Sequence, residues 1–159
     1  MARVGYLAWR GSKGVVVVDG VETEYERVGK EYLVFSPDSR RVAYMAGSSD
    51  KMSVVVDGVA GPVYDGILLG SGPTFSPDSQ HLAYVGKREG KWRLVLDGSE
   101  TECEEIAVNT LTFSPDGKHL AYIVDRGGKK LALVLDGVQA GVATTTPPAI
   151  RPIGDYKTS

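Results

Sequence analysis

The chain has 159 residues, of which 42% are hydrophobic and 24% are charged, and its formal net charge is −2. This composition is ordinary for a folded domain, and the nearly neutral charge excludes a strong overall attraction to nucleic acid or membranes. The single cysteine, Cys103, excludes an internal disulfide framework. No stretch reaches the roughly 20 apolar residues of a membrane-spanning helix, so we predict a cytoplasmic protein, or a periplasmic or extracellular one if a signal peptide was trimmed.

An internal repeat of about 40 residues runs along the chain and is marked by three short motifs. Phe-Ser-Pro-Asp begins at Phe35, Phe75 and Phe113, at spacings of 40 and 38. Asp-Gly dipeptides occur at Asp19-Gly20, Asp57-Gly58, Asp97-Gly98 and Asp136-Gly137. Between these two motifs we align Leu7-Ala8-Trp9, Val42-Ala43-Tyr44, Leu82-Ala83-Tyr84 and Leu120-Ala121-Tyr122. Three motifs in one order at one period indicate four repeats.

The first repeat, near residues 3–31, begins at its second strand because no Phe-Ser-Pro-Asp motif precedes Leu7. We expect strands at residues 4–9 and 15–18, joined by a basic loop. A fourth, acidic strand follows the Asp-Gly turn and carries Glu22, Glu24 and Glu26. Charge on an outer edge strand opposes pairing with the edges of other sheets.

The next two repeats, near residues 32–71 and 72–109, each predict four short antiparallel strands. In the latter, a strand ends at Phe75, and a Ser-Pro-Asp turn follows because proline fixes φ and the Ser and Asp side chains bond to nearby backbone. Further strands are expected at residues 81–85, 92–96 and 100–106. Asp97-Gly98 predicts a two-residue hairpin turn between the last two.

The fourth repeat, near residues 110–154, ends in a segment that can close a ring, with residues 155–159 as a tail. Ile150 to Gly154 can be aligned on Phe-Ser-Pro-Asp-Gly, which predicts a degenerate first strand pairing with residues 4–9. An unstructured segment from Thr144 onward is the alternative. Three arrangements stay open: a four-bladed ring, an eight-bladed ring made by a homodimer, and a fragment of a longer array.

Four antiparallel strands at this period form a propeller blade, so the predicted fold class is all-β, with one propeller or half-propeller domain over residues 1–154. The motifs beginning at Phe75, Leu82 and Val54 resemble the WD40-like repeat of TolB-type β-propellers. The resemblance extends from residue 3 to about residue 142. It implies the fold but no particular activity, because that repeat serves scaffolds, peptidase domains and lyases alike.

The sequence predicts no catalytic residue, metal site or cofactor. Gly70-Ser71-Gly72 lacks the third glycine and the helix of a phosphate-binding loop. His81 and His119 share a surface turn position that Arg41 fills in another repeat, so we interpret them as turn residues. Acidic neighbours of Cys103 disfavour a reactive thiolate. The repeated aspartates occupy turns, where Asp is chosen for its backbone contacts.

Positive charge gathers in the loops between the second and third strands of the repeats. These loops hold nine Lys and Arg residues against Asp50, Glu89 and Asp125, a local net charge of +6. The predicted ligand-binding residues among them are Arg10, Lys13, Lys87, Arg88, Lys91, Arg126, Lys129 and Lys130. We expect this basic face to bind a protein or a small anionic ligand, with solvated hairpin tips as the alternative. No aromatic residues alternate with the cations, so nucleic acid is not expected, and neither is a membrane.

These observations predict a non-enzymatic interaction or scaffold module. The alternatives are a propeller domain or fragment of a hydrolase-type or lyase-type enzyme, and a structural repeat array without a ligand.

Overall fold

The computed structural model of the chain describes residues 3–29, 33–48, 50–67, 72–128 and 130–143. Every regular element in this part is a β-strand, and it has no helix that could cross a membrane. The strands form four separate antiparallel sheets, which we number as blades 1 to 4 in chain order.

The blades contain the following strands. Blade 1 has β1 (Gly5–Arg10), β2 (Lys13–Val18) and β3 (Val21–Tyr25). Blade 2 has β4 (Arg27–Val28), β5 (Val34–Phe35), β6 (Val42–Ser48), β7 (Lys51–Val56) and β8 (Val59–Ala60). Blade 3 has β9 (Gly66–Ile67), β10 (Thr74–Phe75), β11 (Leu82–Arg88), β12 (Lys91–Leu96) and β13 (Ser99–Cys103). Blade 4 has β14 (Thr112–Phe113), β15 (Leu120–Asp125), β16 (Leu131–Leu135) and β17 (Val138–Ala143).

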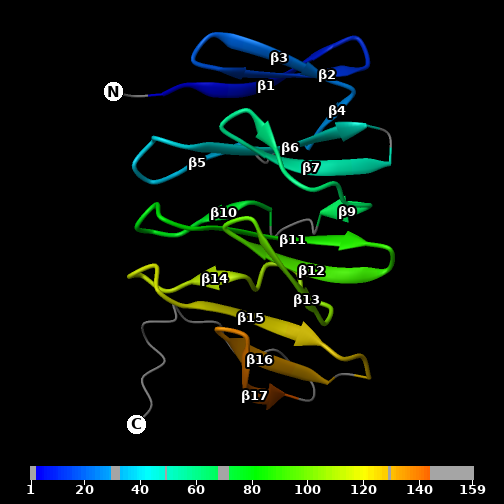
Figure 1. Cartoon of the computed structure of the whole chain (residues 1–159), viewed down its shortest axis with the longest axis vertical. Helices are drawn as coiled ribbons and strands as arrows, with labels where there is room; N and C mark the ends of the chain where they lie inside the picture. Colours follow the sequence, from blue (N-terminus) through cyan, green and yellow to red (C-terminus); the bar gives the residue numbers. More distant parts are fainter. Residues whose placement is uncertain (1–2, 30–32, 49, 68–71, 129, 144–159) are drawn as a thin grey trace.

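The blades lie one on another in chain order, with blade 1 and blade 4 at opposite ends of the stack (Figure 1). The tips of the β6–β7, β11–β12 and β15–β16 hairpins lie along one side, at the right of the view. The connections from β5 to β6, from β10 to β11 and from β14 to β15 lie along the other side. The all-β fold and the four repeats are therefore confirmed, and the two sets of loops lie on opposite sides.

The inner strand of each later blade is split into two short pieces that pair with the same neighbour. In blade 2, both β4 and β5 pair with β6, and in blade 3 both β9 and β10 pair with β11. In blade 4, Ile106 bridges to Val124 of β15 and thus belongs to that sheet. The expectation that the preceding outer strand extends to Ile106 was wrong. It ends at Cys103, because the chain crosses to the next blade there.

The four Asp-Gly dipeptides form identical two-residue turns, as predicted. The aspartates have φ of 49–50° and the glycines 82–83°, so both central residues adopt the left-handed conformation of a type I′ turn. Glycine adopts it without steric cost, and aspartate tolerates it better than most residues. The turn fixes which residues of the flanking strands face each other.

The hairpin register corrects the alignment of the first repeat. Tyr6 pairs with Val17 just as Tyr44 pairs with Val55, so Val4-Gly5-Tyr6, not Leu7-Ala8-Trp9, corresponds to Val42-Ala43-Tyr44. The distance to the Asp-Gly turn shows the same in sequence: Tyr6 precedes Asp19 by 13 positions, as Tyr44 precedes Asp57. Leu7-Ala8-Trp9 was aligned wrongly because it resembles the true motif in having an aromatic residue after an alanine.

The hydrophobic core lies between blades, not within one. Three buried clusters join blades 1 and 2, blades 2 and 3, and blades 3 and 4. From the sequence, Trp9 and Trp92 are both interpreted as strand residues that pack between blades. Trp92 packs against the last of these clusters. Trp9 is 52% exposed and belongs to none of the three clusters, so the prediction for Trp9 was wrong.

The described residues do not form a ring closed within one chain. β1 pairs with β2 along one edge, and the predicted closing strand at Ile150 lies outside the described residues. Blade 4 lies at the far end of the stack from blade 1 (Figure 1). The four-bladed ring, the eight-bladed homodimer and the longer array all stay predictions.

Candidate functional site

The Phe-Ser-Pro-Asp motif builds a turn that locks its own backbone. The Ser36 hydroxyl donates to Asp38 Oδ1 at 2.6 Å and accepts the Arg41 amide at 3.0 Å. Asp38 Oδ1 also accepts the Arg40 amide at 3.0 Å. Ser76 and Ser114 make the same contacts with Asp78 and Asp116, and all three serines are buried. These aspartates therefore serve the turn, as predicted.

The same hydrogen bonds hold the pKa of Asp38, Asp78 and Asp116 below the usual carboxyl value. The serine hydroxyl is the largest cause in each case, followed by a backbone amide. A pKa depressed in the folded state adds stability above the unfolded pKa, and this stability is lost as pH falls through the folded pKa.

We therefore expect the urea midpoint of unfolding to fall as pH drops below about 4. Replacing the donor should flatten that dependence, because a carboxyl without the hydroxyl bond titrates closer to its unfolded value. The measurement is a series of urea unfolding curves between neutral and acid pH for the wild type and Ser76→Ala. Parallel pH profiles of the two proteins would contradict this assignment.

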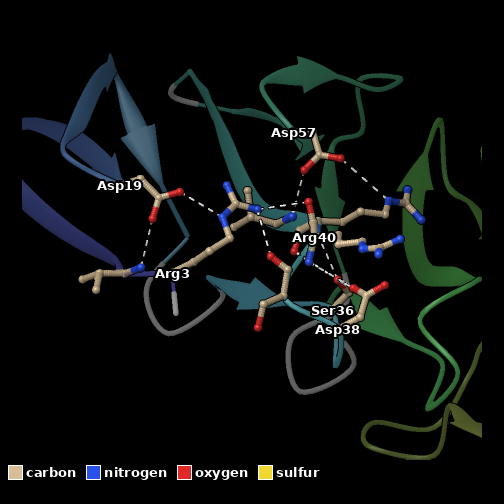
Figure 2. Close-up of polar contacts among 10 residues, drawn as sticks. Arg3, Asp19, Ser36, Asp38, Arg40 and Asp57 are labelled. Carbon is tan, nitrogen blue, oxygen red and sulfur yellow. Dashed lines mark hydrogen bonds and ion pairs between the residues drawn. The ribbon is translucent and has the colours of Figure 1, made fainter. Parts of the chain in front are cut away.

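In a second repeated contact, an arginine or histidine side chain pairs with the aspartate of the Asp-Gly turn. Asp57 Oδ1 accepts the Val42 amide at 2.9 Å, while its Oδ2 lies 3.7 Å from the Arg41 guanidinium. Arg3 fills the position of Arg41 in blade 1, at 2.9 Å from Asp19. Figure 2 shows Arg3 extending beyond Asp19 to blade 2, where it donates to the carbonyl oxygens of Ser39 and Arg40 at 3.2 and 3.1 Å.

His81 and His119 occupy the position of Arg41 in blades 3 and 4. Their Nδ1 atoms lie 2.6 Å from Asp97 and Asp136 respectively. Because arginine performs the same role in blades 1 and 2, the position requires a hydrogen-bond donor to the turn, not a base. The interpretation of both histidines as turn residues agrees with this geometry.

The residue at this position in each of the first three blades also stacks on the phenylalanine of the following blade. The Arg3 guanidinium lies 5.3 Å from the Phe35 ring centre, and that of Arg41 lies 5.4 Å from Phe75. The His81 ring stacks on Phe113 with centroids 6.4 Å apart. These recurring contacts thus join each blade to the next.

The predicted basic tips are exposed apart from the half-buried Arg88, and acidic residues on or just after the outer strands accompany them. Arg10 lies 2.9 Å from Glu22, and Lys13 lies 3.2 Å from Glu24. Lys91 lies 3.4 Å from Glu102. Two pairs are bidentate: Arg88 with Glu100, at 3.0 and 2.8 Å, and Arg126 with Glu104, at 2.7 and 2.9 Å. The acidic surplus thus lies beside the tips, which reduces the expected charge difference between the two faces.

Three predicted binding residues stand outside these ion pairs. The Lys87 ammonium lies 5.1 Å from the Trp92 ring centre. Lys130 makes no ion pair within the part of the chain that the structure describes, and Lys129 lies outside that part. The sequence could have indicated the glutamate partners, because Glu22 and Glu24 alternate along the strand that follows the first basic loop.

The Arg88–Glu100 pair belongs to a denser network at the junction of blades 2 and 3. The Tyr64 hydroxyl donates to Glu100, and the Arg88 guanidinium lies 5.2 Å from the centre of the Tyr64 ring. Arg88 and then Tyr64 lower the pKa of Glu100, whereas burial is the main cause of the raised pKa of Tyr64. All three groups have partners, so the network joins blades and leaves no free acid or base.

Cys103 stands at the position that Tyr25 and Tyr64 occupy in blades 1 and 2. Burial raises the pKa of its thiol to about 11, and the nearby Glu102 and Glu104 add to the rise. The predicted lack of thiolate character agrees with this, although burial exceeds the acidic neighbours as its cause.

Shallow clefts of about 490, 420 and 520 Å³ lie at the three junctions, in chain order. Valines and turn residues line much of the first two clefts, and Glu102, Glu104 and Arg126 contribute to the third. Because a cleft recurs at each junction, it follows from the shape of the repeat. Among the described residues, no three His, Cys, Asp or Glu side chains gather as a metal site would require.

Two solved structures resemble this stack of blades. TolB from Acinetobacter baumannii matches with a TM-score of 0.52 and 15% identity, over 91% of this chain and 41% of that one. A putative TolB from Agrobacterium tumefaciens matches with a TM-score of 0.52 and 18% identity, over 91% of this chain and 58% of that one. The chain has a TolB-type propeller fold.

The expected resemblance to TolB-type propellers is therefore confirmed for the fold. At these identities the likeness concerns the fold alone. The chain spans about half the length of the two TolB structures. No family model and no curated protein sequence matches the chain.

Proposed function

We propose that this chain is a non-enzymatic interaction module that binds an anionic partner through its basic hairpin tips. The observation that carries the proposal is the tip of the β1–β2 hairpin. Arg10 and Lys13 are 63% and 56% exposed there, and their partners in the described residues are the exposed Glu22 and Glu24. The β11–β12 tip repeats this arrangement with Lys91 and Glu102.

Exposed ion pairs do not prevent a ligand from using the same cations. Such pairs contribute about 0–1 kcal/mol, because water screens them and two long side chains must be held in place. A ligand carboxylate or phosphate can replace the glutamate at small cost in free energy. The arginine guanidinium can donate paired hydrogen bonds to either of these anions. The glutamates compete with a ligand for the same cations. They therefore weaken the binding of anions that fit the tip poorly.

The contacts of the side chains that could act in catalysis support a non-enzymatic role. Ser36, Ser76 and Ser114 hold the turns, and His81 and His119 substitute for arginine in a turn contact. A catalytic group requires a position of its own facing a substrate, whereas these groups recur from blade to blade and contact residues of the protein's own turns.

Glu22→Gln with Glu24→Gln is expected to strengthen binding to a polyanion, because it frees Arg10 and Lys13 from their competitors. The measurement is the salt concentration that elutes the protein from sulfated dextran beads. Fewer competing charges at the tip should shift elution to higher salt.

The matched control is Val59→Lys with Val138→Lys, which raises the net charge by the same two units at exposed positions beside the Asp-Gly turns, away from the tips. Equal elution shifts for the two double variants would mean that only net charge matters, and the proposal would fail. A larger shift for the glutamate variant supports the tips as the binding surface.

A further inference from the structure

The middle strand of blade 3 carries an arginine where the other blades carry a smaller side chain. Arg93 of β12 pairs with Gly86, two residues before Val95, which pairs with Tyr84. By the same register, the corresponding residues of the other blades are Val15, Ser53 and Ala132. These three residues are only 1–7% exposed. Three of the four blades thus form without an arginine at this position, so the fold does not require one there.

The side chain of Arg93 faces blade 2. Successive residues of a strand point to opposite sides of the sheet, and Val95, two positions further on, belongs to the cluster that joins blades 2 and 3. Trp92 and Leu94 pack instead against the cluster that joins blades 3 and 4. Blade 3 lies inside the stack, between blades 2 and 4, so this junction involves neither end of the stack (Figure 1).

Arg93 enters this junction without a polar partner. Its Nε atom is buried, and no acceptor in the described part of the chain bonds to it. None of the ion pairs formed by the described residues includes Arg93. A buried donor on a charged group destabilises the folded state unless it is hydrogen-bonded. The residue as a whole is only half-buried, so a ligand can approach it from solvent.

The two glutamates on the same face of blade 3 already have partners. Glu100 accepts two hydrogen bonds from the Arg88 guanidinium, at 3.0 and 2.8 Å. Glu102 lies opposite Arg93 on β13, yet its carboxylate lies 3.4 Å from Lys91. A partner for Arg93 must therefore be an anion that comes from outside these residues.

The charges on this face favour a ligand with one negative charge. Three cations stand against two carboxylates, a net charge of +1, and these residues are Arg88, Lys91, Arg93, Glu100 and Glu102. One carboxylate balances that charge. A phosphate carries up to about two negative charges at neutral pH, so it would be repelled more strongly by the glutamates. A planar guanidinium also donates two parallel hydrogen bonds to a carboxylate.

We propose that the junction of blades 2 and 3 binds a carboxylate group through the Arg93 guanidinium. A free small acid and an acidic side chain of a partner polypeptide both present this group. The proposal does not rest on anion binding by the hairpin tips, which is tested at the β1–β2 tip by elution from sulfated beads. Either proposal can therefore fail while the other holds.

The direct test is an NMR titration of the arginine Nε–H resonances of the full chain with sodium acetate, at an ionic strength held constant with chloride. The Arg93 resonance, assigned by its loss in Arg93→Lys, should shift saturably. Arg3 and Arg126 are internal controls, because their Nε atoms already donate to Asp19 and Glu104, at 2.9 and 2.7 Å. No saturable shift for Arg93, or equal shifts for all three arginines, would overturn the proposal.

A peptide arm of the titration separates the two sources of the carboxylate. The probes are the capped tripeptide Gly-Glu-Gly and its counterpart Gly-Gln-Gly. A saturable shift with acetate alone assigns the site to a free small acid, whereas a shift with both acetate and Gly-Glu-Gly assigns it to a carboxylate that a polypeptide can carry. A shift with Gly-Gln-Gly would overturn the proposal, because that peptide has no carboxylate.

Variants give an independent readout through the urea midpoint of unfolding. Acetate should raise the midpoint of the wild type, because a ligand that binds only the folded state stabilises it. Arg93→Met should fold as well as the wild type, since it removes an unpartnered charge, but its midpoint should not respond to acetate. Lys118→Met is the matched control: Lys118 is exposed in a turn of blade 4, and its loss removes the same charge. An acetate response that persists in Arg93→Met, or that disappears in Lys118→Met as well, would overturn the proposal.

Discussion

Tyr64→Ala is expected to lower the free energy of unfolding by about 3–5 kcal/mol, the range for truncating a large buried aromatic side chain. Tyr64 has no exposed surface and lies at the junction of blades 2 and 3. Its ring meets that of Tyr84 edge to face, with centroids 6.2 Å apart. Truncation would leave a cavity between two blades that touch chiefly through such side chains. Urea unfolding followed by circular dichroism measures the loss.

Two further variants separate packing from hydrogen bonding at this site. Tyr64→Phe removes only the bond to Glu100, which keeps its bidentate pair with Arg88, so we expect a loss of about 1 kcal/mol. Gly86 lies under the ring, where an added Cβ would come within 2.5 Å of Tyr64 Cδ1. Gly86→Ala should therefore destabilise the wild type clearly and the Tyr64→Ala variant much less. Equal losses in both backgrounds would contradict the contact.

Replacing Ser36, Ser76 and Ser114 together by alanine is expected to cost more than any other polar change. Each buried hydroxyl is both donor and acceptor within its turn, and its loss leaves a carboxylate and an amide without that partner. Such a loss costs about 1–3 kcal/mol per site. The three together approach the total stability of an ordinary domain, about 5–15 kcal/mol, so we expect a largely unfolded chain.

The single variants and an exposed serine calibrate this prediction. Ser36→Ala, Ser76→Ala and Ser114→Ala should lose similar amounts, because their contacts are the same. Ser99→Ala is the control, since Ser99 is exposed at the start of β13, and it should stay within about 0.5 kcal/mol of the wild type. Thermal and urea midpoints measure both effects. A triple variant as stable as Ser99→Ala would show that the turns do not depend on the hydroxyls.

The turn chemistry and the strand order were readable from local sequence. Asp57-Gly58 implies a type I′ turn because glycine adopts positive φ freely, and the structure has that turn in all four blades. The Ser-Pro-Asp turn follows from residues that bond their own backbone within a few positions. These interactions act over a short stretch of chain, so the sequence contains all of their participants.

The candidate site was only partly predictable. The basic residues were found from their loop positions, but the pairing of Arg126 with Glu104 joins residues 22 positions apart from adjacent blades. The motif at Leu7 was misaligned because an alanine and an aromatic residue resemble the true motif, whereas the hairpin register assigns Tyr6 to it. Register is set by backbone pairing over the whole strand, which a three-residue motif does not capture.

The sequence by itself determined the repeat, the all-β class and the turns, because propensity, proline, glycine and short polar side chains act locally. Only the tertiary structure showed that the Asp97–His81 and Asp57–Arg41 pairs are the same contact in different blades. It also showed that Arg41 stacks on Phe75 of the next blade. It alone showed Tyr6 exposed where Tyr84 is buried. Burial and partners depend on how each blade lies against the next, and that is set by side-chain packing between separate sheets.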